Sequence, residues 1–424
     1  MSSKQIEAEP SATKYNPQRP STNPQLLQIG ITDESEPLRT ASVWGAIGVE
    51  AVIAQCYPNQ ISLFYQSFDV IAARQEGLEF AATLESHGVR VLMARDILAE
   101  TLKPKTFKKT SVIGELVEKA EAIQSSHNTH IDNAAELINI QQEADIERYG
   151  EEKALNLNHT LSLSPQLPLG NSIYGRDQMN VLLGARVVSR MAKLIRRPEV
   201  SLYELIYKGS LAPHQTINIP TDETFEGGDA YVHQGHVWIG VGSRTSFGAA
   251  IKIYEALKPE LDLAGLKFAV VQDEDPYGRP FSEQQSFMHL DTFSNPTGRR
   301  DIAVCLEEAT RRKVKLLISS KGQTRIEETG LSFIDYLEHE VKEEEIVKIS
   351  LEEQKEFGCN FLLLGKNNDG RDVILVPLEN NNGINNQLRK NGKVVKTVEL
   401  YESTRGYGAA HCMTGQLLRE AYYG

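Results

Sequence analysis

The chain has 424 residues, of which 40% are hydrophobic and 24% charged, and its formal net charge at pH 7 is −12. This length provides one large domain or two ordinary ones, and the composition is that of a soluble globular protein. The acidic balance argues against nucleic acid or an anionic membrane as the main partner, and the sequence has no run of about 18 apolar residues that could span a bilayer.

The first hundred residues predict a tail followed by alternating strands and a helix. Residues 1–24 are rich in Ser, Pro, Gln and Asn, which is typical of a mobile tail, and residues 25–424 are expected to form one domain. Short apolar runs predict strands, and apolar residues at helical spacing before Gly88 predict a helix with a C-cap. The predicted strands are Leu26–Gly30, Leu38–Trp44, Ala51–Ala54 and Val89–Met93, and the predicted helix is Phe68–His87.

A helical insertion is predicted at about residues 103–160, where Lys, Glu, Gln and Ala dominate and apolar residues recur at helical spacing. The prolines of Leu161–Gly170 predict a connecting loop, after which strands and helices alternate again. The α/β part contains a hairpin around Gln234-Gly235. Its other predicted elements are the helix Thr245–Ala256, the strands Phe268–Gln272, Val314–Ile318, Phe361–Leu364 and Val373–Val376, a mostly helical acidic stretch Leu331–Lys355 and an Asn-rich turn Asn380–Asn386.

Residues 405–414 hold a candidate nucleophile near the C-terminus. Cys412 has His411 beside it, and Gly406 and Gly408 permit backbone angles that would let this loop approach a ligand closely. A thiol that ionises near neutral pH would be a nucleophile, although a lone cysteine is more often a small buried hydrophobe. The four cysteines have neither metal-site nor disulfide spacing. That spacing predicts a reducing, cytoplasmic setting without a metal or other cofactor.

Three further polar clusters stand out, and each alone has an ordinary structural interpretation. Tyr174–Asp177 contains an Arg-Asp pair that could be a surface ion pair, and Phe225–Asp229 contains two carboxylates that could satisfy their own turn. Met288–Asp291 places a His and an Asp on one face of an expected extended segment. With Cys412 they supply a nucleophile, a base, an orienting carboxylate and spare carboxylates, a set suited to covalent chemistry on a cationic carbon.

These four clusters, in this order, resemble the guanidino-modifying superfamily and most closely the arginine deiminase family. The resemblance runs from about Leu26 to Arg419, and the helical insertion is similar to arginine deiminases rather than to the smaller dimethylarginine hydrolases. It implies a pentein-type fold, in which five ββαβ modules form an α/β propeller around a closed pocket. It also implies a homo-oligomer that hydrolyses L-arginine to L-citrulline and ammonia without a cofactor.

The resemblance further implies a role for each site residue. Cys412 would attack the guanidinium carbon, His289 would protonate the leaving nitrogen and then activate water, and Glu226 would orient His289. A neighbouring cation, either this histidine or the substrate, should favour the thiolate. Two further catalytic carboxylates, Asp177 and Asp291, would clamp the guanidinium nitrogens. The substrate-binding residues would be Asn171, Arg196 and Arg244, which bind the amino acid's carboxylate, and Asp229. Arg190 and Arg197 lie close enough in sequence to be alternatives to Arg196.

The cysteine loop departs from the family pattern. Tyr407 stands where an arginine is common, Ala409-Ala410 replace a Gly-Gly pair, and Gly415-Gln416 replace Cys-Pro. This loop closes over the substrate in the family, so three alternatives stay open. They are an amidinotransferase that passes the amidino group to an amine, a deiminase of a modified arginine, and a non-enzymatic arginine-binding protein. The binding protein ranks last because it has no need for both the cysteine and the histidine.

Overall fold

The computed structural model describes residues 27–103, 105–163, 168–208, 211–212, 215–278, 280, 284, 286–378 and 382–420. The mobile tail predicted for residues 1–24 lies outside this part of the chain. None of the helices within it combines the length and the hydropathy that a membrane-spanning segment needs.

Five groups of three strands in the described residues repeat one pairing pattern. In each group the middle strand pairs antiparallel with one neighbour and parallel with the other. The groups, each with its middle strand second, are β19 (Gly415–Arg419), β2 (Leu38–Val43), β3 (Arg90–Met93); β4 (Met179–Leu182), β5 (Ala185–Val188), β7 (Gln215–Asn218); β8 (Ala230–His233), β9 (His236–Val241), β10 (Lys267–Gln272); β11 (Ser294–Gly298), β12 (Asp301–Cys305), β15 (Glu345–Ile349); and β16 (Leu362–Lys366), β17 (Asp372–Val376), β18 (Val394–Thr397). β13 (Lys313–Ser320) and β14 (Gln323–Ser332) extend the third group at β10, and β1 (Leu27–Gln28) pairs with β6 (Leu211–Ala212).

Each parallel pair is connected through helix, as a parallel crossover requires. The crossover helices are α3 (Val70–Ser86), α9 (Arg197–Tyr207), α10 (Phe247–Ala264), α13 (Leu306–Arg311) with α14 (Phe333–Tyr336), and α16 (Asn382–Lys390). The remaining α-helices are α1 (Val49–Gln55), α2 (Asn59–Ser62), α4 (Ala94–Thr101), α5 (Lys109–His127), α6 (Ala134–Tyr149), α7 (Glu151–Asn158), α8 (Gly175–Gln178), α12 (Leu290–Phe293) and α15 (Leu351–Lys355). The fold is therefore mixed α/β, as the sequence predicts.

Two predicted elements show why local sequence is informative. The predicted helix Phe68–His87 is α3, whose N-cap Asp69 accepts hydrogen bonds from the backbone N–H groups of Ile71 and Ala72. Gly88 follows with φ +80°, the left-handed conformation that suits glycine after a helix. The predicted hairpin is formed by β8 and β9, with positive φ at both residues of the Gln234-Gly235 turn.

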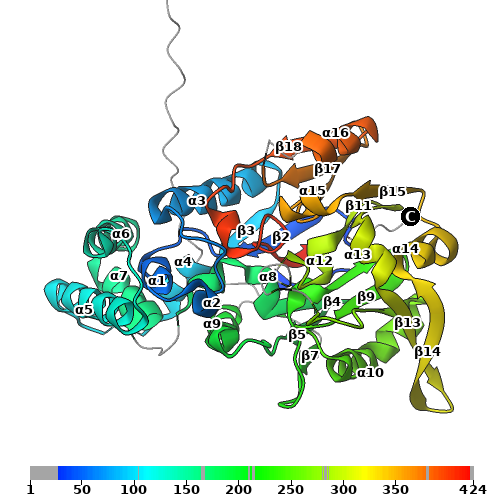
Figure 1. Ribbon diagram of the computed structural model, residues 1–424, viewed down its shortest axis with the longest axis horizontal. Helices are drawn as coiled ribbons and strands as arrows, with labels where there is room; N and C mark the ends of the chain where they lie inside the picture. Colours follow the sequence, from blue (N-terminus) through cyan, green and yellow to red (C-terminus); the bar gives the residue numbers. More distant parts are fainter. Residues whose placement is uncertain are drawn as a thin grey trace, which may run out of the picture.

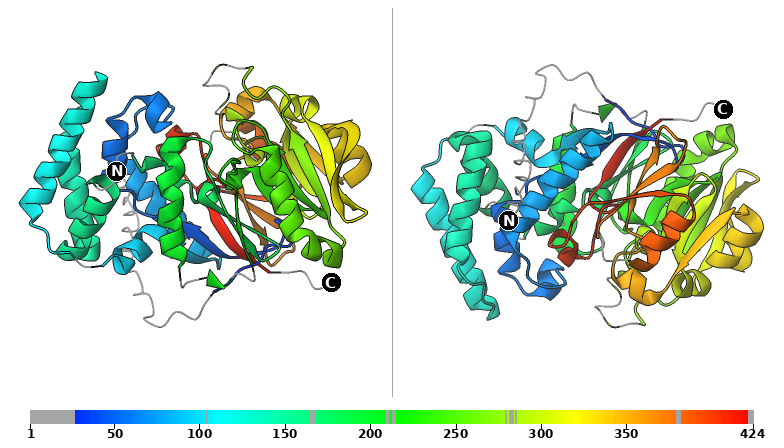
Figure 2. Two further views of the ribbon diagram at one scale, coloured as in Figure 1. Left: turned by 90° about the horizontal axis from the view of Figure 1, so that it is seen from below. Right: turned by 90° about the horizontal axis from the view of Figure 1, so that it is seen from above.

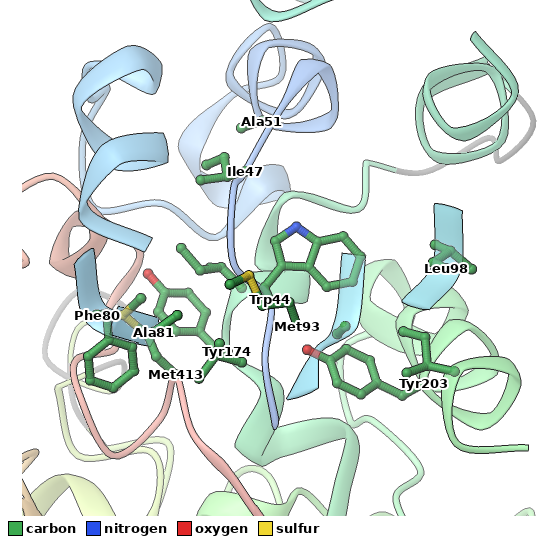
Figure 3. Packing of buried hydrophobic residues seen from close by; sticks show 14 of the residues in the cluster. Trp44, Ile47, Ala51, Phe80, Ala81, Met93, Leu98, Tyr174, Tyr203 and Met413 are labelled. Carbon is green, nitrogen blue, oxygen red and sulfur yellow. The ribbon is translucent and has the colours of Figure 1, made fainter. Parts of the chain in front are cut away.

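The segment that carries Cys412 is anchored in the largest hydrophobic core. Met413 is buried in this core together with Tyr174, and Figure 3 shows both side chains beside Phe80 and Ala81. The rings of Trp44 and Tyr203 pack nearby with centroids 6.1 Å apart. Burial of Met413 fixes the backbone next to the cysteine, because core side chains are held by close packing.

Helices α5, α6 and α7 occupy the stretch where the helical insertion is predicted. They lie together at one end of the molecule, opposite the β13–β14 hairpin (Figures 1 and 2). A buried ion-pair cluster joins these helices to α1 and α4. Arg95 of α4 donates to Glu50 of α1 at 3.0 Å and to Asp145 of α6 at 2.6 Å. This cluster connects the helical segment firmly to the strand groups.

Two secondary-structure predictions are wrong. Ala51–Ala54 belongs to helix α1 rather than a strand, and all of α1 is buried. The described part of the predicted Asn-rich turn, residues 382–386, is the start of helix α16. The acidic stretch Leu331–Lys355 is mostly helical as predicted, but it also contains strand β15, which pairs parallel with β12.

Two predictions about the polar clusters also need correction. The segment Met288–Asp291 is not extended throughout, because His289 has extended backbone angles but Asp291 lies in the single helical turn α12. Arg176 does not form a surface pair with Asp177. It is 1% exposed and is paired with buried Glu34.

Candidate active site

Cys412 lies in a turn before β19, and its side chain is 1% exposed. It lines a narrow cavity with residues from distant parts of the chain. The other lining residues are Leu63, Asn171, Tyr174, Asp177, Arg196, Arg244, Met288, Gly406, Tyr407 and Gly408. The fold thus brings the cysteine together with the predicted polar side chains Asn171, Asp177, Arg196 and Arg244.

The two glycines of the cysteine loop are needed for space rather than for unusual backbone angles. A Cβ atom on Gly406 would lie 2.2 Å from the Tyr174 hydroxyl, and one on Gly408 would lie 2.5 Å from the Tyr174 ring. The left-handed residue is instead Tyr407, with φ +66°. The Tyr174 hydroxyl donates to the Ser403 carbonyl at 2.7 Å, so this tyrosine supports the loop at two places.

His289 lies directly behind the cavity lining, with a carboxylate at each ring nitrogen. Its Nε2 is 2.9 Å from Glu226 Oε2, and its Nδ1 is 3.5 Å from Asp177 Oδ1. Complete burial alone would lower the pKa of His289, but Asp177 and Glu226 raise it to about 9. The imidazole is therefore held as a proton donor near neutral pH.

Glu226 is the carboxylate that orients this histidine. Burial alone would raise the pKa of Glu226, but Arg244, the imidazole of His289 and Arg196 together hold it well below its usual range. Arg244 Nη1 donates to Glu226 Oε2 at 3.2 Å, and the backbone N–H of Ala192 donates to Oε1 at 3.0 Å. These contacts keep the carboxylate ionised and fixed.

Of the three neighbouring candidates Arg190, Arg196 and Arg197, only Arg196 lines the cavity. It donates to Asp177 Oδ2 at 2.6 Å and to the backbone carbonyl of Asn171 at 3.3 Å. The two alternatives considered from sequence donate to other backbone carbonyls, Arg190 to that of Thr221 and Arg197 to that of Met191. The Asn171 amide donates to the Ser62 carbonyl at 2.6 Å.

Cys412 is surrounded mainly by groups that oppose its ionisation. Its sulfur is 3.7 Å from Asp291 Oδ2 and 3.0 Å from the amide nitrogen of Asn360. Burial and the charges of Asp291 and Asp177 raise the pKa of the thiol well above its usual range. The expected preference for the thiolate is therefore not produced by the protein's own groups, His289 included.

The sequence predicts no role for His411, but the structure places this residue between two carboxylates. Its Nδ1 is 2.8 Å from Asp291 Oδ2, and its Nε2 is 3.0 Å from Glu34 Oε2. Both nitrogens can donate only in the imidazolium form. Burial and Arg176 would lower the pKa of His411, but Glu34 and Asp291 raise it. His411 thus neutralises part of the charge beside the sulfur.

Asp229 lies one layer behind the cavity rather than in its lining. Its Oδ1 accepts from the backbone N–H of Leu290 at 3.0 Å, between His289 and Asp291. Burial raises the pKa of Asp229 to about 7. Its contact positions the segment that carries two other site residues.

Two groups in the described residues have the ligand types of a metal site. Asp177, Glu226 and His289 offer ligand atoms within 4.8 Å of one another. Asp335, Glu338 and His339 form the second group, which is exposed. In the first group, Arg196 and Arg244 already supply positive charge to the carboxylates.

Tyr407 also lines a second, wider cavity of about 390 Å³. Its ring packs edge-on against Tyr65, with centroids 5.5 Å apart. Asn360 and Arg405 contribute to the same wider cavity. Tyr407 therefore lies between the narrow cavity of Cys412 and a larger space, where a lid residue would be.

Sequence reasoning missed Asn360 and Glu34, both of which contact site residues. Neither belongs to a motif. Asn360 is an isolated polar residue before an apolar run, and Glu34 lies in the polar stretch Thr32–Glu36, so neither position gives a signal for a site. The fold alone brings them to Cys412 and His411.

Comparison with known proteins connects this site to one family. Residues 62–419 match the family described as Arginine deiminase. The arginine deiminase of Mycoplasma capricolum is 25% identical over 361 residues, covering 80% of this chain and 85% of that protein. That of Listeria monocytogenes serotype 4b is 24% identical over 367 residues, covering 80% and 86%.

Two solved structures share the fold. DDAH from Pseudomonas aeruginosa, a mutant complexed with citrulline, matches with a TM-score of 0.51 at 14% identity, covering 91% of this chain and 100% of that one. The substrate-bound N-terminal domain of ArgZ, an arginine dihydrolase from the ornithine-ammonia cycle in cyanobacteria, matches with a TM-score of 0.51 at 15% identity, covering 90% and 97%. Since the family match spans most of the chain, the protein belongs to the arginine deiminase family and is a hydrolase that acts on guanidino carbon–nitrogen bonds.

Proposed function

We propose that this protein hydrolyses L-arginine to L-citrulline and ammonia through a covalent intermediate on Cys412. The observation that carries the proposal is the composition of one closed site. A buried cysteine lines the cavity, and the ion pairs of His289 with Glu226 and Asp177 lie directly behind it. A nucleophile, a proton donor and its orienting carboxylate are thus within reach of one small cation.

The charges of the site favour a guanidinium ion with a carboxylate at its other end. Asp177 and Asp291 would accept hydrogen bonds from the planar N–H groups, which suit paired carboxylates. Arg196, Arg244 and Asn171 would hold the amino acid's carboxylate. Arg196 also neutralises Asp177 through the 2.6 Å contact, which limits the electrostatic cost of burying that carboxylate.

The guanidinium cation itself would supply the charge that Cys412 needs. Its arrival between Asp177 and Asp291 offsets the two carboxylates that hold the thiol protonated. The thiol then loses its proton to water, the sulfur forms a bond to the guanidinium carbon, and the electrons of the C=N bond move to nitrogen. His289 gives its proton to a terminal nitrogen, the C–N bond breaks, and ammonia leaves. The result is an amidino group held on Cys412 as a thiouronium.

The same histidine completes the reaction. Neutral His289 takes a proton from water, and the hydroxide bonds to the amidino carbon. Collapse of this adduct breaks the C–S bond and returns the electron pair to sulfur, while the hydroxyl proton leaves with ammonia as ammonium. General acid–base help of this kind typically contributes about 10²–10⁴-fold in rate.

Two alternative chemistries would also proceed through a covalent adduct on Cys412. An amidinotransferase would break the other C–N bond and release ornithine, and a modified arginine would carry an extra group past the lid. Tyr407 favours the second alternative over the first, since it lines both the narrow cavity and the wider one.

The test is product analysis with L-arginine labelled in its guanidino carbon, with and without glycine or lysine as an acceptor. The proposal predicts labelled citrulline and ammonia in equal amounts, with no need for the acceptor. Label transferred to the acceptor with release of ornithine would establish the transferase. Unchanged arginine would direct the search to modified guanidines, with Tyr407 as the first residue to vary.

The proposal extends to the setting of the enzyme. The five repeated strand groups support arrangement of the modules as a five-bladed ring, in one catalytic domain over residues 25–424 with a helical insertion. The proposed cytoplasmic location rests on the cysteine spacing, and the proposed homo-oligomeric assembly rests on the family resemblance. Light scattering on the purified full-length protein would test the assembly, since a monomeric mass would contradict it.

A further inference from the structure

Asn360 is a buried asparagine that accepts three hydrogen bonds from the backbone of the cysteine loop. It follows α15 in sequence and is 1% exposed. Its Oδ1 accepts from the backbone N–H groups of Ala409 at 2.9 Å and Cys412 at 3.2 Å, and its own carbonyl accepts from the N–H of His411 at 3.3 Å. These contacts place an amide side chain directly against the candidate nucleophile.

The same contacts determine which way the amide points. A carbonyl oxygen is required where two backbone N–H groups converge, since an NH₂ group cannot accept either bond. The Nδ2 group must therefore face the other side, where the sulfur of Cys412 lies 3.0 Å away. The donor is aimed at the reacting atom by the backbone of the nucleophile's own loop.

This N–H donor favours the thiolate, whereas the negative charges around the sulfur disfavour it. Asp291 places carboxylate oxygens 3.7 and 3.9 Å from the sulfur, and a carboxylate disfavours a neighbouring thiolate. An N–H directed at sulfur favours the anion instead, and hydrogen bonds to charged groups are stronger than those between neutral groups. The neutral amide adds no charge that would repel the guanidinium cation.

We propose that Asn360 is a further catalytic residue, which donates a hydrogen bond to the Cys412 sulfur, stabilises its thiolate and directs it toward the guanidinium carbon. The proposal rests on the proposed function of Cys412 as the nucleophile. A donor to a charged group is worth about tenfold to a hundredfold in the equilibrium it favours. Its loss should therefore lower thiolate formation by that factor.

The test is the rate at which iodoacetamide alkylates Cys412 between pH 7 and 9, followed by peptide-resolved mass spectrometry on the full-length protein. Asn360→Asp keeps the shape of the side chain and the oxygen that accepts the two backbone N–H groups. It replaces the donor by a second oxygen. We expect alkylation of Cys412 at least about tenfold slower than in wild type at each pH, with kcat reduced and KM for arginine little changed. A smaller variant, Asn360→Ser, should also be slower.

Asn295→Asp is the matched control. Asn295 is also 1% exposed, and its amide donates to the backbone carbonyls of Cys359 and Phe361, on either side of Asn360. The Asn295→Asp variant introduces a comparable buried carboxylate that does not contact the sulfur. The alkylation rate of Cys412 should therefore stay near wild type. General loosening of the loop would raise alkylation rather than lower it.

Wild-type alkylation rates in folded Asn360→Asp and Asn360→Ser would overturn the proposal and leave Asn360 as a structural residue. Equal slowing in Asn295→Asp would overturn it as well. The readout needs no arginine, so it separates this proposal from the proposed function. Failure of wild type to convert arginine would contradict that function without changing the alkylation result.

Discussion

The molecule contains two buried, charge-rich clusters that differ in how completely their polar atoms are paired. In the helical segment, the guanidinium of Arg95 donates to Glu50, Asp145 and Asn158 through all three of its nitrogens. In the candidate active site, Asp177 Oδ1 and His289 Nδ1 have no hydrogen bond within the described residues, although they face each other at 3.5 Å.

The difference separates a structural cluster from a functional one. A buried charge network is stable when its members satisfy one another, as around Arg95. A site that must bind a cation keeps unused acceptors directed at its cavity and requires the fold to hold them there. Burial and charge alone therefore do not identify a functional site. Polar atoms without a hydrogen bond beside a nucleophile do.

The sharpest test of this contrast is the loss of the nucleophile. Cys412→Ala should reduce citrulline formation by at least about 10⁴-fold, because removing a covalent nucleophile commonly abolishes nearly all chemistry. Arginine binding by calorimetry and the midpoint of thermal unfolding should stay near wild type. Retained turnover would remove the covalent mechanism.

The opposite pattern is expected from the structural cluster. Arg95→Met leaves the buried carboxylates of Glu50 and Asp145 without their cation, which should lower the free energy of unfolding by about 3–5 kcal/mol. Urea denaturation measures this loss, and kcat per folded molecule should be unchanged. A lower kcat without loss of stability would contradict the assignment of this cluster to structure.

Substrate recognition is probed by Arg244→Ala. Loss of a charged hydrogen-bond donor costs about 1.5–3 kcal/mol, so KM for L-arginine should rise by about tenfold to a hundredfold. KM for agmatine, which lacks the carboxylate, should change much less. Since Arg244 also contacts Glu226, kcat should fall for both substrates alike. Equal effects on both KM values would mean that Arg244 does not bind the carboxylate.

Counted per pH unit, the smallest effect is a pH dependence of stability. The pKa values of His289 and His233 are raised from 6.5 to about 9 and about 10, because carboxylates adjoin both despite burial. A raised pKa means that the folded state binds the proton more tightly than the unfolded state. The stabilisation is therefore complete below about pH 6.5 and is lost as the pH rises through 9 to 10, by at most about 1.4 kcal/mol per pH unit for each histidine.

Denaturation at several pH values distinguishes the two histidines. His233 lies between Asp33 and Glu343, outside the cavity lining. His233→Gln should reduce the slope of stability against pH and leave the pH dependence of turnover intact. His289→Gln should reduce the same slope and abolish turnover. A slope unchanged in both variants would contradict these protonation states.

Much of the fold follows from local sequence signals, and the errors occur where packing overrides them. Ala51–Ala54 is a short apolar run, and such runs do not distinguish a strand from a buried helix. In α16 the asparagines favour a turn, but Ile384 and Leu388 lie one helical turn apart and are both buried. In β15 the acidic neighbours hide buried Val347 and Ile349, whose alternation is that of a strand.

The site residues also divide into those that the sequence identifies and those that only the fold reveals. Cys412, His289 and the carboxylates are found from sequence because they lie in motifs with recognisable spacing. Asn360 contacts the nucleophile from 52 positions away, and Glu34 contacts His411 from 377 positions away. Neither contact has a local signal, because only the pairing of distant strands creates it. The protonated state of the thiol likewise depends on burial and on Asp291, which the sequence does not place.

The most direct test of the central claim is to quench the enzyme with acid during turnover of L-arginine and determine the mass of the Cys412 peptide. The account predicts an adduct equal to arginine minus ammonia, because a terminal nitrogen leaves first and the amino acid stays attached. A bare amidino adduct would show that ornithine leaves instead and would contradict the hydrolase. An unmodified peptide in every quenched sample, with citrulline still accumulating, would contradict covalent catalysis by Cys412.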